Sequence, residues 1–253
     1  MEKLTREQAV QEGDYGFPYH WTKTRDTQSG RLYFGYFDIC VEELEKHLNT
    51  LGLAKTKARI LDAGCGDGRF LKQLQDSGFP KIAGVDYSKR ALSFGKLLLP
   101  DVQLERADFA TGTSFQDGAF DAIVMIETLE HIIPSQIPLV LKELARILKK
   151  GGIIIVTVPS KAIPVGPKHY QHFDKESMRS TLEPVFTVRE IFGQDKLGFH
   201  PLKLLYMALD NKLWDIPRAR KKYNRTVWAK HFNKCKPTEG RRVIAIAEKN
   251  EYA

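Results

Sequence analysis

Short apolar runs alternate with amphipathic stretches from residue 58 onward. The apolar runs predict strands at Ala58–Ala63, Ile82–Asp86, Val102–Arg106, Phe120–Ile126, Ile153–Val158, Val185–Phe192 and Arg241–Glu248. Apolar positions at helical spacing predict helices between them, at Gly68–Ser77, Lys89–Leu99, Gln136–Lys149 and Lys175–Leu182. Strands that alternate with helices of about 10–15 residues form βαβ units. The pattern therefore predicts an α/β domain with a doubly wound, largely parallel sheet over residues 58–253.

Single residues mark the ends of several of these elements. Ser88, Ser135 and Asp174 each precede a helical run, where a side-chain oxygen can accept a hydrogen bond from an unpaired backbone N–H. The run Gly152–Val158 is almost continuously apolar, which is typical of a central strand covered on both faces. These signals agree with the alternating pattern.

Two regions stand outside the pattern. Residues 1–57 contain the aromatic cluster Tyr15–Trp21 and a predicted amphipathic helix at Leu32–Leu51. The helix carries a stripe at Tyr33, Phe37, Val41 and Leu44 that we expect to pack on the sheet. Residues 15–21 either cover a pocket as part of a lid or serve packing. Residues 199–240 are too many for a turn, so we expect a helical insertion that acts as a cap or binding loop.

The chain has 253 residues, of which 42% are apolar, and a net charge of +8. The segment from His200 to Arg242 contains twelve Lys or Arg residues and three Asp or Glu residues, a net charge of +9. The rest of the chain is therefore close to neutral. A basic patch favours anionic partners such as phosphates, nucleic acids, acidic glycans or anionic lipid. A solvated helical face is the alternative interpretation.

Composition also bears on location. No apolar run approaches the roughly 20 residues that a transmembrane helix needs. The first ten residues mix charged and polar side chains, unlike a signal peptide. The cysteines, Cys40, Cys65 and Cys235, are odd in number and lack the spacing of metal ligands. We therefore expect a cytoplasmic protein without a disulfide framework.

The strongest motif is Ile60–Arg69, in which a strand ends in a glycine-rich turn that opens a helix. Glycines let the backbone approach a ligand, and a helix N-terminus presents free N–H groups. The spacing of Gly64, Gly66 and Gly68 differs from the G-x-G-x-x-G of dinucleotide folds, and no P-loop lysine follows. Asp62, at the end of the strand, would repel a pyrophosphate and attract a cation.

Acidic residues end the next two predicted strands. Asp86, twenty residues after Gly66, can accept hydrogen bonds from both hydroxyls of a ribose. Asp108 can accept a hydrogen bond from an adenine amine, and Phe109 can stack on the ring. Together with the glycine turn, these residues predict a nucleoside site.

This arrangement resembles the class I S-adenosylmethionine (SAM)-dependent methyltransferases over roughly residues 58–192. The resemblance implies a Rossmann-like sheet of seven strands whose last strand, Arg241–Glu248, is antiparallel between two neighbours. It implies that SAM is the cofactor. It also implies a set of cofactor-binding residues, which are Asp62, Gly64, Cys65 and Gly66 around the methionine part, Asp86 and Tyr87 at the ribose, Asp108 and Phe109 at the adenine, and Ile126 and Glu127 along the cofactor.

The segment after the fourth predicted strand supplies candidate catalytic residues. Glu130 and His131 lie there, and His172 follows in a later loop. Either histidine can act as a general base. The E-x-x-E-H pattern also looks like that of small-RNA 2′-O-methyltransferases and ubiquinone-pathway O-methyltransferases, which would imply a divalent ion at Glu127, Glu130, His131 and His172. We do not favour the metal, and the alternative role of His169 and His172 is packing between a loop and the following helix.

The resemblance implies a SAM-dependent methyltransferase. We expect a small or glycan-like acceptor, anionic because of the basic segment, and methylated at oxygen. One alternative is an RNA 2′-O-methyltransferase, in which Arg218, Arg220, Lys221, Lys222 and Arg225 contact phosphates. A second alternative is a SAM-binding protein without transfer activity. The oligomeric state has no signal in the sequence.

Overall fold

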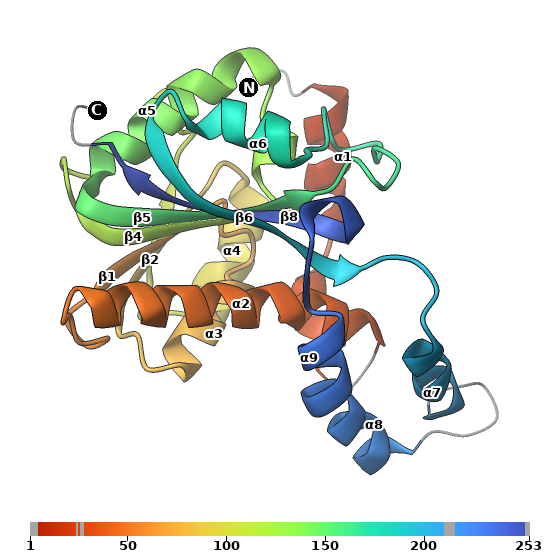
Figure 1. The fold of residues 1–253 in the computed structure, drawn as a ribbon. Helices are drawn as coiled ribbons and strands as arrows, with labels where there is room; N and C mark the ends of the chain where they lie inside the picture. Colours follow the sequence, from red (N-terminus) through yellow and green to blue (C-terminus); the bar gives the residue numbers. More distant parts are fainter. Residues whose placement is uncertain (1–4, 24, 26–27, 210–215, 251–253) are drawn as a thin grey trace.

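Eight strands form a single mixed sheet in the computed structural model, which describes residues 5–23, 25, 28–209 and 216–250. The strands are β1 (Arg59–Ala63), β2 (Lys81–Asp86), β3 (Gln103–Arg106), β4 (Phe120–Ile126), β5 (Leu148–Pro159), β6 (Phe186–Lys196), β7 (Lys234–Cys235) and β8 (Gly240–Lys249). Their order in the sheet is β3-β2-β1-β4-β5-β8-β6-β7 (Figure 1). The order reverses between β1 and β4, and ligands of open α/β sheets bind at such a switch point.

Strands β1 to β5 run parallel, and β8 runs antiparallel to both β5 and β6. The predicted antiparallel last strand is therefore confirmed. The predicted number of seven strands is corrected to eight. The additional strand, β7, has two residues and pairs with Gly193 and Gln194 of β6. It lies within residues 199–240, where the sequence pattern did not predict a strand.

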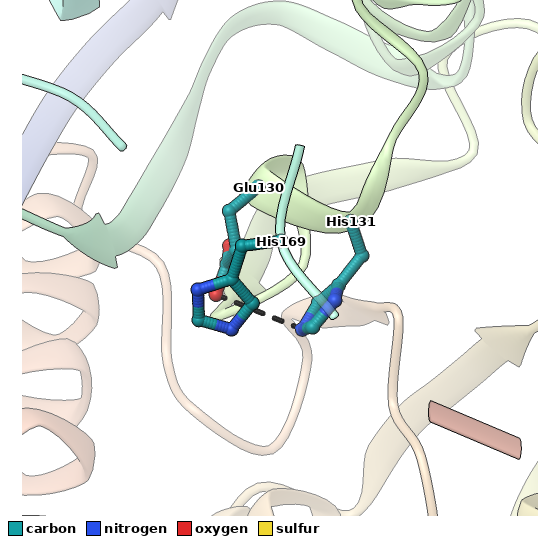
Figure 2. Close-up of side chains that lie close together, drawn as sticks. All are labelled: Glu130, His131 and His169. Carbon is teal, nitrogen blue, oxygen red and sulfur yellow. Dashed lines mark ion pairs between the residues drawn. The ribbon is translucent and has the colours of Figure 1, made fainter. Parts of the chain in front are cut away.

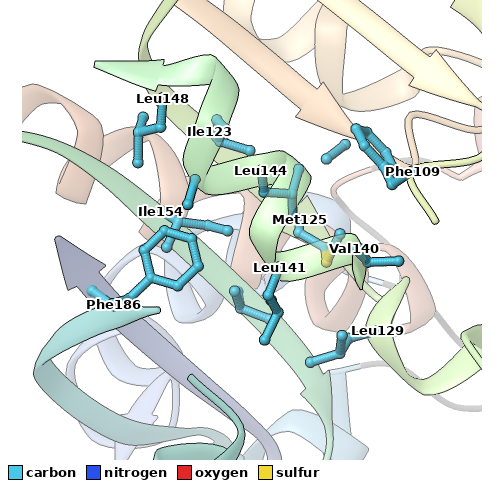
Figure 3. Packing of buried hydrophobic residues seen from close by; sticks show 14 of the residues in the cluster. Phe109, Ile123, Met125, Leu129, Val140, Leu141, Leu144, Leu148, Ile154 and Phe186 are labelled. Carbon is cyan, nitrogen blue, oxygen red and sulfur yellow. The ribbon is translucent and has the colours of Figure 1, made fainter. Parts of the chain in front are cut away.

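Helices cover both faces of the sheet (Figure 1). On one face lie α2 (Gln28–Thr50), α3 (Arg69–Asp76) and α4 (Lys89–Leu98); on the other lie α5 (Ile137–Ile147) and α6 (Lys175–Leu182). Each face has its own apolar core. Figure 3 shows the core under α5, where Val140, Leu141 and Leu144 pack against strand residues such as Ile123 and Met125. The two cores fix the strand ends, and with them the loops that carry the predicted site.

Two of the three predicted helix N-caps are confirmed. Ser88 accepts a hydrogen bond from the Ala91 N–H at 3.0 Å, and Asp174 accepts one from the Ser177 N–H at 2.7 Å. Ser135 does not cap, because it lies inside a 3-10 turn at Pro134–Gln136 and α5 begins only at Ile137. In α2, Phe37, Val41 and Leu44 of the predicted stripe are buried against the sheet, whereas Tyr33 is only half-buried.

A first helix, α1 (Arg6–Asp14), was not among the predicted elements. Its start is fixed by a capping box, in which the Thr5 side chain accepts from the Gln8 N–H and the Gln8 side chain accepts from the Thr5 N–H. The T-x-x-Q spacing is visible in the sequence, but no apolar periodicity accompanies it. The helix buries none of its own side chains.

The basic segment forms a small helical unit beside the sheet: α7 (Pro201–Leu209), α8 (Pro217–Tyr223), a π-helical turn (Asn224–Trp228) and α9 (Ala229–His231). Its own core consists of Tyr206, Tyr223, Trp228 and Phe232. In Figure 1, α7 and α8 project away from the sheet. Among the described helices, none combines the length and apolar character that crossing a bilayer requires.

Candidate cofactor and acceptor site

The glycine turn after β1 is built for a close approach of backbone to its neighbours. Gly64 has φ 82° and Gly66 has φ 52°, values that favour glycine. A Cβ atom on Gly64 would lie 2.2 Å from Thr128 Oγ1, and one on Gly66 would lie 2.6 Å from the Tyr15 hydroxyl. Both positions therefore require glycine for conformation and for space.

Asp86 ends β2 and faces this turn. Its Oδ2 accepts a hydrogen bond from the Gly66 N–H at 2.8 Å, and its Oδ1 accepts one from the Ser88 N–H at 2.8 Å. Burial raises the pKa of Asp86 to about 6, although the two N–H donors oppose the shift. The backbone thus holds a buried carboxyl in one orientation, and each oxygen keeps a second lone pair for a ligand hydroxyl.

Negative charge accumulates around the turn. Asp62 and Asp67 are buried close to Asp86. Burial, followed by the charges of Asp86 and Asp67, raises the pKa of Asp62 well above its usual range. A ligand that carries positive charge would relieve this repulsion, whereas a polyphosphate would increase it.

The strand ends open into a large cavity of about 1260 Å³. Ligand pockets commonly measure about 300–1,000 Å³, so this one has room for two small molecules. All ten sequence-predicted cofactor residues line it: Asp62, Gly64, Cys65, Gly66, Asp86, Tyr87, Asp108, Phe109, Ile126 and Glu127. Glu130, His131 and His169 line the same cavity. The sheet edge therefore brings the nucleoside residues and the candidate catalytic residues together.

Figure 2 shows Glu130, His131 and His169 pointing toward one another. Glu130 and His131 lie on a 3-10 turn (Leu129–His131) after β4, and His169 comes from the loop between β5 and α6. His131 Nε2 is 3.8 Å from Glu130 Oε1. One ligand atom from each of the three residues falls within 4.8 Å of the others.

Backbone carbonyls determine which ring nitrogens carry protons, because a carbonyl can only accept. His131 Nδ1 donates to the Lys168 carbonyl at 2.8 Å, which leaves Nε2 with a lone pair. His172 Nδ1 donates to the Ile163 carbonyl at 3.1 Å, so its Nε2 accepts from His169 Nδ1 at 2.8 Å. His169 Nε2 is then also unprotonated.

His172 itself is buried and is absent from the cavity lining, unlike His169. The structure thus puts His169 at the cavity and His172 behind it. Sequence reasoning named His172 as a catalytic candidate and left His169 out of the site, since residues three apart in a loop carry no signal for which one faces a ligand.

Burial shifts the protonation of this cluster toward neutral forms. It lowers the pKa of His131 to about 4 and that of His169 to about 3, where nearby histidines add to the effect. Burial, together with the charge of Glu127, raises the pKa of Glu130 well above its usual range. Neither Glu130 carboxyl oxygen has a hydrogen-bond partner among the described residues. At neutral pH the two histidines therefore present lone pairs to the cavity.

Glu127 has a different environment from Glu130. Its backbone has φ 48°, unusual for a residue with a Cβ, and its carboxylate forms an ion pair with Arg242 Nε at 3.0 Å. The Thr157 hydroxyl donates to Glu127 Oε1 at 3.2 Å. Arg242 in turn lies over the Tyr36 ring, 4.5 Å from its centroid. Glu127 is thus a charge-paired residue of the cavity wall, and the partner on β8 was not predicted.

The N-terminal residues form the remaining wall. Tyr15, Tyr19 and His20 line the cavity; the His20 ring lies 3.0 Å from an Asp67 carboxyl oxygen, and the Trp21 indole N–H donates to the Asp67 carbonyl at 3.0 Å. Helix α1 closes the same side. Three polar contacts join α1 and the preceding Thr5 to the cavity wall: Thr5 Oγ1 to Tyr170 OH at 2.5 Å, Tyr87 OH to Gln11 Oε1 at 3.1 Å, and Lys168 Nζ to Asp14 Oδ2 at 2.9 Å.

The described residues of the basic segment, 199–240, do not form part of this wall. Among its described residues, 199–209 and 216–240, none lines the cavity. The cavity is walled instead by the sheet edge, the histidine loop and the N-terminus.

A family model described as a methyltransferase domain matches residues 37–199. The chain belongs to this methyltransferase family. Relatives include a demethylmenaquinone methyltransferase of Lactococcus lactis, 28% identical over 60% of this chain and 61% of that protein. Another is a ubiquinone biosynthesis O-methyltransferase of Alkalilimnicola ehrlichii, 31% identical over 60% of this chain and 69% of that protein.

A solved structure agrees with this membership at the level of fold. A SAM-dependent methyltransferase from Archaeoglobus fulgidus superposes with a TM-score of 0.53 at 19% identity, over 86% of this chain and 98% of that one. The resemblance to class I SAM-dependent methyltransferases, and SAM as their cofactor, are confirmed. The chain spans only 61% of the Lactococcus protein and 48% of a related Dictyostelium discoideum enzyme.

The cavity fits SAM by two independent features. Its buried carboxylates favour a ligand with a positively charged sulfur and an amino group. Asp86 stands at the strand end where the fold rule puts a ribose.

Proposed function

We propose that this protein transfers a methyl group from SAM to a hydroxyl oxygen of a small acceptor. The observation that carries the proposal is the cavity itself, in which the residues predicted to bind a nucleoside and two unprotonated histidine nitrogens share one space. The family supports methyl transfer, and a relative named as an O-methyltransferase supports oxygen as the acceptor atom.

In this proposal one half of the cavity holds the cofactor. Asp86 accepts hydrogen bonds from the ribose hydroxyls, with Tyr87 beside it. Asp62 and the backbone from Gly64 to Gly66 hold the charged methionine end. The adenine lies at Asp108 and Phe109, and Ile126 and Glu127 line the passage toward the acceptor. When bound, SAM supplies a methyl group on a positively charged sulfur.

The histidine half of the cavity orients and deprotonates the acceptor. As the oxygen–methyl bond forms and the sulfur–methyl bond breaks, the hydroxyl proton passes to His131 Nε2. The buried carboxyl of Glu130, 3.8 Å from His131 Nε2, lies beside the resulting imidazolium and stabilises it. His169 Nε2 accepts a second hydrogen bond from the acceptor, and His172 holds the His169 ring in place.

The N-terminal segment, residues 1–57, acts in this proposal as a lid as well as a packing element. Tyr15, Tyr19 and His20 shield the glycine turn, and α1, which has no fully buried side chain, is joined to its surroundings by polar contacts. Excluding water strengthens the electrostatic interactions inside a site. Contacts of this kind release more readily than a buried apolar face, which suits a segment that must let the ligands in.

The expectation of an anionic acceptor rested on the basic segment. Because the described residues of that segment are absent from the cavity lining, we define the acceptor by its hydroxyl group rather than by its charge. A small organic or glycan-like hydroxyl compound fits the space left beside the cofactor. The same absence leaves the RNA alternative without a contact to the cavity.

A second candidate is metal-assisted transfer at the same place. The lone pairs of His131 and His169 and the unpartnered carboxyl of Glu130 form a donor set suited to a divalent ion such as Zn²⁺ or Mn²⁺. An ion there would lower the pKa of the acceptor hydroxyl directly. Glu127 and His172 fit this role less well, since Glu127 is paired with Arg242 and His172 lies behind His169.

Transfer of labelled methyl groups tests the proposal. The full chain is incubated with methyl-labelled SAM and a panel of small phenols, catechols and sugar alcohols, with and without a chelator. We expect label in an ether that resists mild base, at the same rate in the chelator. Loss of activity in the chelator and its return with a divalent ion would select the metal candidate. Calorimetric SAM binding without label transfer to any acceptor class would select the non-catalytic alternative.

A further inference from the structure

Helix α7 is apolar on both sides, with Lys203 as its one charged residue. Its inner face packs in the small core of the basic segment through Leu202 and Tyr206. The Tyr206 ring lies 5.5 Å from the Tyr223 ring of α8, centroid to centroid. Helices that are apolar all round are normally covered by other parts of the protein or by a membrane.

The outer face of α7 is instead exposed to solvent. Leu204 and Leu205 are 50% and 48% exposed. Phe199, just before the helix, is 79% exposed, and Ile216, just before α8, is 46% exposed. These four large apolar side chains belong to α7, to the residues that lead into α7 and α8, and thus to one small unit of contacting helices, which concentrates the apolar exposure in one part of the fold.

Exposed basic side chains accompany the patch. Arg218, Lys221, Lys222 and Arg225 follow Ile216 on α8 and the next turn, and all four are exposed. Within the described residues of 199–240, Glu239 is the sole acidic residue, against nine Lys and Arg. The surface thus combines protruding apolar side chains with positive charge, and it lies outside the cavity.

We propose that this α7–α8 surface docks the protein on an anionic lipid bilayer. An interfacial helix inserts its apolar side chains among the lipid headgroups while neighbouring Lys and Arg attract anionic lipid. The protrusion of α7 and α8 in Figure 1 suits insertion into a surface. A second copy of the chain would bring two strongly positive segments together, and an RNA would leave the leucines without a partner.

Vesicle flotation of the full chain tests this proposal independently of the methyl transfer. We compare phosphatidylcholine vesicles with vesicles in which about a third of the lipid is phosphatidylglycerol, a surface that attracts basic residues. We expect binding to the anionic vesicles that is at least about tenfold tighter than to the neutral ones. The pair Leu204→Glu and Leu205→Glu should reduce it about tenfold or more, and so should Lys221→Gln with Lys222→Gln.

Leu97→Glu is the matched control, because Leu97 is 77% exposed on α4, away from the patch. It should bind vesicles like the unchanged protein. Circular dichroism and SAM calorimetry confirm that each variant is folded. No binding to anionic vesicles, equal binding to both vesicle types, or an equal loss in Leu97→Glu would overturn the proposal. Dimers that the leucine pair abolishes, or tighter binding to an RNA oligonucleotide that the leucine pair leaves unchanged, would overturn it in favour of another partner.

Discussion

The two halves of the cavity are held in place in different ways. In the cofactor half, the carboxyl of Asp86 accepts from two backbone N–H groups, at Gly66 and Ser88, and both belong to turns that follow parallel strands. In the acceptor half, His131 and His172 are oriented by carbonyls of one irregular loop, Lys168 and Ile163. The first half is fixed by the sheet, whereas the second depends on how a loop packs.

The largest effect should come from the cofactor half. Asp86→Asn removes the charge that accepts the ribose hydroxyls while keeping the side-chain shape. Charge-assisted hydrogen bonds contribute about 1.5–3 kcal/mol each, so we expect SAM affinity to fall by about a hundredfold or more in calorimetry. Asp76→Asn, an exposed residue of α3, serves as the control. Unchanged affinity in Asp86→Asn would remove the ribose role from this residue.

Substitutions in the acceptor half should lower the rate of methyl transfer and leave the affinity for SAM unchanged. His131→Ala should lower the rate at saturating SAM by about a hundredfold or more, the usual contribution of a general base. His169→Ala should lower it less, because it positions the acceptor. His231→Ala, in the basic segment, is the control. If His131→Ala weakened the affinity for SAM and preserved the rate, His131 would belong to the cofactor site and not to a separate acceptor site.

This contrast explains what the sequence could predict. Asp62, Asp86 and Asp108 follow strands that apolar runs identify, and parallel strands deliver their carboxyl ends to one edge, so their meeting in one cavity follows from topology. His169 and His172 lie in a loop without periodicity, and the sequence does not reveal the hydrogen bond to the Ile163 carbonyl that holds His172 behind His169. The pairing of Glu127 with Arg242 was missed for another reason, because it joins the end of β4 to β8 and these strands are not neighbours in the sheet.

The pH dependence of SAM binding and of the rate distinguishes the two halves of the cavity in the unsubstituted protein. Burial raises the pKa of Asp86 to about 6, so this carboxyl gains a proton as pH falls through 6 and loses its acceptor charge. We expect SAM affinity to fall by up to about tenfold per pH unit below that value. In Asp86→Asn the part of this pH dependence that comes from Asp86 should be lost, and any that remains would come from Asp62, whose pKa is raised as well. Flat binding of the unchanged protein between pH 7 and about 5 would contradict the assignment.

The rate of methyl transfer at saturating SAM should fall at a lower pH than the affinity for SAM does. The pKa of His131 is lowered to about 4, so its Nε2 stays unprotonated while Asp86 titrates. The rate should therefore be level from pH 7 to about 5 and fall only when His131 gains a proton. A rate that falls in parallel with affinity through pH 6 would mean that the acceptor half titrates with the cofactor half.

The smallest effect concerns the helix that closes both halves. Tyr170→Phe removes the hydroxyl that Thr5 Oγ1 contacts at 2.5 Å but leaves the aromatic ring. Exposed or half-exposed polar contacts contribute about 1 kcal/mol or less, so we expect less than about a fivefold increase in hydrogen exchange of the α1 amides. SAM should then slow this exchange in both proteins, because α1 closes over the ligand. If SAM leaves the α1 amides unchanged while it protects the turn at Gly66, α1 is a fixed wall and the lid role is lost.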